Sequence, residues 1–219
     1  MNGEVVKPLK ADLFGRVLRV DSSEGVKVVR ETASARWWVR WLARLLAARE
    51  ARSLRALQGL DGFPRLISWD GSRLERSWIE GRPLQDARRA DPEFYAALRR
   101  HLVRLHRLRV THNDLAKQPN VLERPDGRPA LVDFQLARHH PRRGRWFRLC
   151  GREDLRHVLK HKRRYCAWAL TPRESAMLAK RSAPARVWRV TGKPVYMFWT
   201  RKILRWSDRE GAGDRGELT

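Results

Sequence analysis

The sequence has little cysteine, no long apolar run and few acidic residues. Its two cysteines, Cys150 and Cys166, are too few for a disulfide framework or a cysteine-ligated metal cluster. No window contains the roughly 18 consecutive apolar residues that a membrane-spanning helix needs, and the first residues lack the apolar stretch of a secretory signal. We therefore expect a cytoplasmic protein in a reducing compartment. If it meets a membrane, we expect peripheral contact at the inner face.

Acidic side chains are outnumbered two to one by basic ones. The chain carries 24 Asp and Glu against 48 Lys and Arg, a formal net charge of +24. Such an excess favours a polyanionic partner, which includes nucleic acid, an anionic membrane surface and an acceptor that already carries phosphate. The charge does not choose among these partners, and arginines on ordinary solvated faces would give the same composition.

The apolar content is sufficient for a folded core, since 42% of the residues are hydrophobic and ten of them are Trp. Alternation and turn residues predict strands at 13–20 and 26–30 and a strand pair within 63–79, around Asp70-Gly71. Three- and four-residue spacing predicts a helix over 33–58, with Ser34 as its cap, and a second helix that begins at Asp91-Pro92. A loop over 111–120 and a short hairpin over 121–132 follow.

This order of elements predicts an α+β fold with two lobes. We expect a strand-rich first lobe over 1–80, a helical second lobe over 81–206 and a frayed tail over 207–219, with a break near Gly81.

Two carboxylates and an amide stand on neighbouring segments after the second helix. Asp114 and Asn120 lie in the loop, and Asp133 follows the hairpin, which would bring the three together. Oxygen ligands of this kind suit Mg²⁺, which takes few protein ligands and completes its shell with phosphate and water. A carboxylate that is left free of metal can orient a hydroxyl group and accept its proton.

The run His112-x-Asp114, the later Asn120 and the pair Asp133-Phe134 resemble the catalytic loop and metal-binding segment of the protein-kinase-like superfamily. The resemblance implies the two-lobe kinase fold, with strands in the N-lobe and a reduced helical C-lobe. The sequence has no Ala-Pro-Glu run after Asp133, and in this respect it resembles RIO-type kinases and bacterial lipopolysaccharide-core kinases. The implied activity is ATP- and Mg²⁺-dependent phosphorylation of a hydroxyl group, on a protein Ser/Thr or on a lipopolysaccharide-core sugar.

The same resemblance implies roles for residues of the loop. Asp114 corresponds to the catalytic base, and Lys117 lies where kinases often hold a lysine near the transferred phosphate. Asn120 and Asp133 correspond to the Mg²⁺ ligands, and His112 to a residue that holds the loop against the Asp133 segment. Asp114 and Asn120 are six positions apart, one more than in the usual family motif.

Roles in nucleotide binding are implied for the first lobe. Glu50 corresponds to the helical Glu that orients a strand Lys, and that Lys corresponds either to Arg30 or to Lys27. The two alternatives lie on opposite faces of a strand because they are three residues apart. Glu80 lies in a segment that resembles the linker beside the adenine, and Gly15 is the one glycine where kinases have a glycine-rich loop.

Two other functions remain open, because the glycine-rich loop is reduced and the net charge is strongly positive. One is a pseudokinase adaptor that binds nucleotide without transfer, and the other is a basic RNA- or ribosome-associated factor like the RIO proteins. The Trp-rich segment 37–48 also has two interpretations: it lies in a membrane interface, or its apolar side chains pack under the first lobe. His101 and His106 are expected on an exposed helix face.

Overall fold

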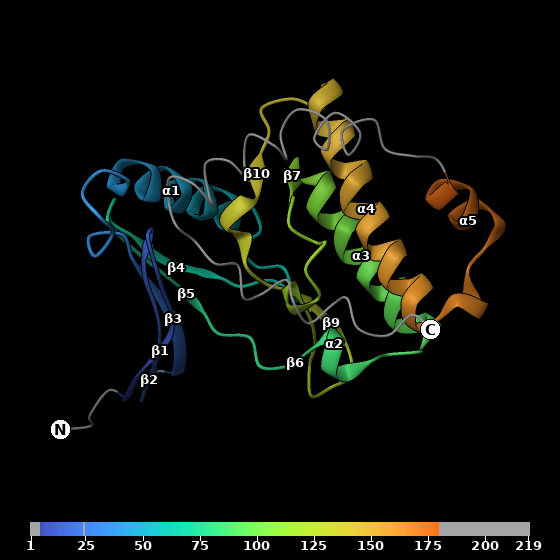
Figure 1. The fold of residues 1–219 in the computed structure, drawn as a ribbon, viewed down its shortest axis with the longest axis horizontal. Helices are drawn as coiled ribbons and strands as arrows, with labels where there is room; N and C mark the ends of the chain where they lie inside the picture. Colours follow the sequence, from blue (N-terminus) through green and yellow to red (C-terminus); the bar gives the residue numbers. More distant parts are fainter. Residues whose placement is uncertain (1–4, 24, 180–219) are drawn as a thin grey trace, which may run out of the picture. The chain divides into compact units, whose positions relative to one another are not determined.

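The amino-terminal part of the chain is an antiparallel sheet of five strands (Figure 1). A computed structural model describes residues 5–23 and 25–179. The strands run in the spatial order β1-β2-β3-β5-β4, so that β3 lies at the centre. Their bounds are β1 (Val5–Asp12), β2 (Gly15–Ser22), β3 (Gly25–Glu31), β4 (Leu66–Trp69) and β5 (Arg73–Ser77).

Strand β1 is absent from the sequence-based prediction, which begins the sheet only at residue 13. Seven of its eight residues are exposed, so that it has no alternation of buried and exposed positions to detect. It contains Pro8, and its pairing with β2 shifts register between Pro8 and Lys10. An edge strand tolerates such a proline, because one row of its backbone groups faces away from the sheet.

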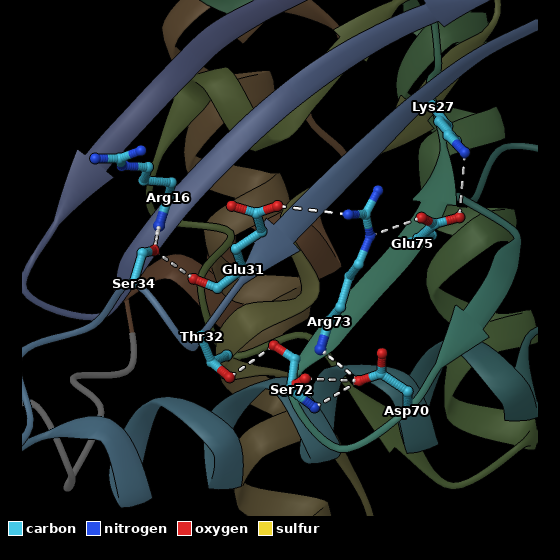
Figure 2. A network of polar contacts seen from close by, with 9 residues as sticks. All are labelled: Arg16, Lys27, Glu31, Thr32, Ser34, Asp70, Ser72, Arg73 and Glu75. Carbon is cyan, nitrogen blue, oxygen red and sulfur yellow. Dashed lines mark hydrogen bonds and ion pairs between the residues drawn. The ribbon is translucent and has the colours of Figure 1, made fainter.

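Polar side chains link β3 and β5 along one face of the sheet (Figure 2). Lys27 Nζ lies 3.4 Å from Glu75 Oε2, and Arg73 pairs with Glu75 at 2.9 Å and with Glu31 at 3.5 Å. Residues two apart on a strand share a face, which explains why Lys27 and Glu31 both join this row. Lys27 therefore lies on the face of the sheet that carries Glu31, Arg73 and Glu75.

Helix α1 (Arg40–Ala56) begins later than predicted. Ser34 does not cap it, because the Ser34 hydroxyl instead donates to Glu31 O and accepts from Arg16 N (Figure 2). The first helical turn has no side-chain cap. The inner face consists largely of small residues, which allows α1 to pack closely against β4 and the segment after Asp133.

The rest of the described chain is mostly helical, with two small sheets. One of these pairs β10 with β7, and the other has the order β6-β8-β9. In chain order the elements are β6 (Arg82–Pro83), α2 (Leu84–Ala87), α3 (Pro92–Arg107), β7 (Val110–Thr111), η1 (Gln118–Asn120), β8 (Val121–Glu123), β9 (Pro129–Leu131), η2 (Phe134–Leu136), β10 (Arg138–His139), α4 (Arg145–Tyr165), η3 (Ala167–Ala169) and α5 (Pro172–Ala179).

Helix α3 starts as the sequence predicts. Asp91 accepts a hydrogen bond from Glu93 N at 2.9 Å, and Pro92 occupies the first turn. Its apolar face, built around Leu98 and Leu102, packs into the main core against α4, β9 and β7. The expectation for His101 is wrong: its side chain is buried, and its ring bonds to Pro129 O.

These elements confirm an α+β protein, and Met1–Ser175 forms one compact unit that contains both the sheet and the helices. The second unit, Ala176–Thr219, lies almost wholly outside the described residues. The part of the expected second lobe over 180–206 and the expected tail over 207–219 also lie outside them. Within the described part of the chain, no helix is both long and apolar enough to cross a membrane. The proposed lobe boundary near Gly81 stays a prediction.

The β1–β2 turn allows a test of the fold at Gly15. Its φ is +113°, and a Cβ there would lie 2.1 Å from the backbone oxygen of Glu31, whereas Gly25 has a similar φ of +120° and open space around it. We expect Gly15→Ala to lower the free energy of unfolding by about 3 kcal/mol and Gly25→Ala by about 1 kcal/mol. Urea unfolding of both variants measures the difference, and equal losses would contradict the close approach.

Candidate functional site

The loop that carries Asp114 is folded onto the strand end that precedes Asp133. The buried ring of His112 bonds through Nε2 to Val132 O at 2.9 Å. Val132 N in turn donates to Asn120 O at 3.0 Å. These two bonds place Asp133 immediately beyond a residue that is tied to both ends of the loop. The contact of His112 is the one that the sequence predicts for it.

The Asp114 carboxylate is oriented by two neighbours in the same loop. Asn120 Nδ2 donates to Asp114 O at 2.8 Å and to Asp114 Oδ2 at 3.0 Å. Lys117 Nζ lies 3.2 Å from the same Oδ2. The 3₁₀ turn η1 ends at Asn120, whose side chain bonds back to Asp114. Asp114, Lys117 and Asn120 therefore form one cluster.

Asp133 has an unusual backbone conformation. Its φ of 59° and ψ of 71° lie in the left-handed region, which is uncommon for a residue other than glycine. The next residue, Phe134, is fully buried, and its ring centroid lies 4.6 Å from that of His112. This packing holds the turn in place. Such conformations persist where the surroundings fix them, and they occur often at functional sites.

Helix α4 supports the Asp114 loop through the buried carboxylate of Asp154. Asp154 is 1% exposed and accepts hydrogen bonds from His112 N and Asn113 N, each at 2.9 Å. The ring of His106 lies 3.2 Å from the same carboxylate, so that the expectation of an uninvolved surface His106 is wrong. Asp154 is absent from the site residues predicted from the sequence. One feature of the sequence sets Asp154 apart: the stretch from Arg138 to Arg164 contains eleven Lys and Arg but only two acids, Glu153 and Asp154.

A second contact from α4 reaches the loop one residue beyond Asp114. His161 Nε2 bonds to Leu115 O at 2.8 Å in a buried setting. Burial lowers the pKa of His161, so that its ring is neutral near pH 7 and Nε2–H donates to the carbonyl. His161 lies within the basic run 160–165, which is therefore not a uniform surface patch. Lys162 is also buried there and pairs with Glu174 at 2.8 Å.

A buried ion triple joins the sheet to α1. Glu50 is fully buried, with Oε2 3.3 Å from Arg30 Nε and Oε1 3.2 Å from Arg76 Nε. Lys27 lies on the opposite face with Glu75. The structure thus brings Glu50 together with Arg30 and not with Lys27. Arg76, which the sequence analysis omits, has a detectable signal: it stands two residues after the core residue Leu74 on one strand.

Glu80 lies apart from both groups. It is exposed in the segment between β5 and β6, and no polar contact of its side chain occurs in the described part of the chain. The segment itself is fastened by Trp78 N, which donates to Val26 O at 3.1 Å. Arg19 lies over the Trp78 ring, 4.8 Å from its centroid. The backbone and the ring of Trp78 are therefore held in a defined position, whereas the Glu80 side chain is exposed.

The donors near Asp133 suit a metal that needs few protein ligands. No group of three or more His, Cys, Asp or Glu that could hold a metal ion occurs among the described residues. Asn120 and Asp133 nevertheless offer hard oxygen atoms on adjoining segments, which fits Mg²⁺ when phosphate supplies further ligands.

A shallow hollow of about 420 Å³ is lined by residues that include Phe63 and Trp78, and neither Asn120 nor Asp133 lines it.

The comparisons with known proteins add no family. No protein-family model matches the chain, and no curated protein matches it in sequence. The likeness to kinases therefore rests on the residues and contacts described above.

The role of Asp154 is testable against its neighbour Glu153. We expect Asp154→Asn to lower the free energy of unfolding by about 2–3 kcal/mol, because the amide group places new N–H donors beside the backbone N–H groups of His112 and Asn113. Glu153→Gln, a matched loss of one charge, should cost less than about 0.5 kcal/mol. Urea unfolding measures both, and a small effect at Asp154 would refute its supporting role.

Proposed function

We propose that this chain is an ATP- and Mg²⁺-dependent phosphotransferase with a protein-kinase-like two-lobe fold and a reduced C-lobe. The observation that carries the proposal is the set of bonds that join the Asp114 loop to the Asp133 segment through His112, Val132 and Asn120. These bonds place a carboxylate, an amide and a second carboxylate on adjoining backbone segments, which is the arrangement that the resemblance to kinases requires.

In the proposed reaction a hydroxyl group of the acceptor attacks the γ-phosphorus of ATP. The new O–P bond forms as the bond to the β-phosphate oxygen breaks, and ADP leaves. Asp114 orients the hydroxyl and accepts its proton. Asn120 Nδ2 donates one bond to the backbone oxygen of Asp114 and one to its carboxylate Oδ2, and the second bond sets the direction of the carboxylate. Lys117, next to Asp114, offsets the negative charge of the transferred group.

Asn120 and Asp133 would hold the magnesium ion. When bound, Mg²⁺ neutralises charge on the phosphate oxygens during transfer. Asn120 Nδ2 is already bonded to Asp114, which leaves its amide oxygen for the ion. The left-handed backbone of Asp133 sets where its carboxylate leaves the chain, because Phe134 beyond it is anchored in the core.

Arg30 is the proposed counterpart of the strand lysine that binds the α- and β-phosphates. It contacts Glu50 through Nε, so that its two terminal nitrogen atoms remain for phosphate, a pairing that guanidinium geometry favours. Arg76 contacts the other oxygen of Glu50 and thereby shares the orienting carboxylate. The backbone of the segment around Glu80 would face the adenine.

The acceptor belongs to one of two classes: a protein Ser/Thr, or a sugar of the lipopolysaccharide core as in the kinases that the chain resembles. The formal charge of +24 supports an acceptor that is anionic or is held at an anionic surface.

A second candidate is a nucleotide-binding adaptor without turnover. Arg30 in place of lysine and the single glycine of the β1–β2 turn, Gly15, favour it. The net charge alone favours a third, a basic RNA- or ribosome-associated factor, for which binding should weaken steeply with salt. Magnesium-dependent thermal stabilisation by ATP without phosphate transfer would select the adaptor.

The transfer reaction predicts a specific pattern of inactive variants. With labelled ATP, Mg²⁺ and a cell extract that supplies both protein and membrane-linked sugars, Asp114→Asn and Asp133→Asn should each lower label transfer by at least about 100-fold. Asp86→Asn, at an exposed position on α2, is the matched control and should transfer like the wild type. Equal transfer by wild type and Asp114→Asn, or none by either, would reject the enzyme.

The assignment of Arg30 is tested by nucleotide affinity. We expect Arg30→Met to weaken Mg²⁺-ATP binding about 10- to 100-fold, whereas Lys27→Met should change it less than about threefold, because Lys27 pairs with Glu75 on the other face. Arg30→Lys should retain most of the affinity. Isothermal titration of variants with unchanged circular dichroism measures this, and a larger effect at Lys27 would reverse the assignment.

A further inference from the structure

The outer face of α1 presents large apolar side chains to solvent. Trp37, in the turn before the helix, is 82% exposed, Trp41 is 67% exposed and Leu45 is 50% exposed. Residues four apart lie one above the other on a helix, so that the row continues from the turn along α1. For these three side chains, the interpretation in which the apolar residues of 37–48 pack under the first lobe is wrong. Water-exposed apolar surface of this kind, when it is contiguous, marks an interaction site.

Arginines surround this row without acidic partners. Trp41, Leu45, Arg44, Arg52 and Arg55 fall within an arc of about 100° at the helical rotation of about 100° per residue. All of these arginines are exposed, and within the described residues none of them lies in an ion pair. The outer face of α1, together with the turn before it, consists of Trp37, Trp41, Leu45, Arg36, Arg44, Arg52 and Arg55.

The sole acid of α1 points the other way. Glu50 is fully buried between Arg30 and Arg76, whereas α1 contains five arginines. The outer face therefore combines apolar and positive groups with no negative charge.

We propose that the outer face of α1 docks onto an anionic lipid bilayer, with the helix lying in the plane of the interface. Tryptophan favours the head-group level of a membrane, and leucine gains by entering the acyl region beside it. The arginines that lie beside the apolar row and beyond it along the helix bind lipid phosphates and anionic head groups.

The shape and chemistry of this face favour lipid over nucleic acid or protein. Single-stranded nucleic acid binds in a positively charged groove with stacked aromatic rings, whereas a single helix is convex and Leu45 offers no ring for stacking. A protein partner would need an acidic face with pockets for two indole rings. A fluid anionic surface requires neither, because it adapts to the side chains that enter it.

The proposal does not rest on the proposed phosphotransfer, because docking is measured without nucleotide. The full chain is tested by flotation with vesicles of phosphatidylcholine and phosphatidylglycerol at 3:1, and with vesicles of phosphatidylcholine alone. We expect binding to the anionic vesicles that is at least about 10-fold stronger than to the neutral ones.

Paired variants separate the two contributions. Trp37→Ser with Trp41→Ser should lower binding to anionic vesicles by at least about 10-fold, whereas Trp168→Ser, which removes a 77% exposed indole from η3, should change it less than twofold. Arg44→Gln with Arg52→Gln should lower it about 25-fold, at about fivefold per arginine. Arg99→Gln with Arg100→Gln removes two exposed charges from α3 and should have a smaller effect.

The proposal is overturned if the wild type fails to float with anionic vesicles, or if Trp168→Ser reduces flotation as much as the α1 pair does. It is also overturned if the α1 variants lose affinity for a single-stranded RNA oligonucleotide while they keep vesicle binding. Unchanged circular dichroism of each variant shows that the altered side chains, all exposed, leave the fold intact.

Discussion

One buried carboxylate organises the candidate site. Asp154 on α4 accepts hydrogen bonds from the backbone N–H groups of His112 and Asn113. The N–H of His112 would otherwise be buried without a partner, at a cost of about 1–3 kcal/mol. With these groups held, the ring of His112 reaches Val132 O, and the loop places Asp114 against Asn120. The geometry of the loop thus depends on a helical residue that follows it by some forty positions in the sequence.

A second buried acid, Glu50, connects two features of α1 that look unrelated. Its contacts with Arg30 and Arg76 and the small residues beside it fix the rotation of the helix about its axis. Any face of a helix that is turned inward determines the face that is turned outward. The burial of Glu50 therefore accompanies the exposure of Trp41, which stands more than two turns away on the other side. Nucleotide binding and surface docking, as proposed, would draw on the same helix.

The parts of the fold that local chemistry determines follow from the sequence. The cap at Asp91, the turn at Asp70-Gly71 and the bond of His112 all depend on residues close in the chain or on a strong motif. The start of α1 and the strand β1 do not, because Ser34 bonds to the sheet instead of the helix and β1 is an exposed edge. Asp154 acts across a long stretch of chain, so that no local pattern reveals its partners.

The choice between Arg30 and Lys27 shows why strand pairing has to be known before a role can be assigned. The period of two separates the residues onto opposite faces, but it does not say which face meets α1. The answer depends on β5, whose Glu75 stands across from Val29 and on the face of Lys27. Glu75 pairs with Lys27 on one face of the sheet, whereas Glu50 on the other face pairs with Arg30 and Arg76. The sheet order β3-β5, a long-range property, therefore sets which cation faces α1.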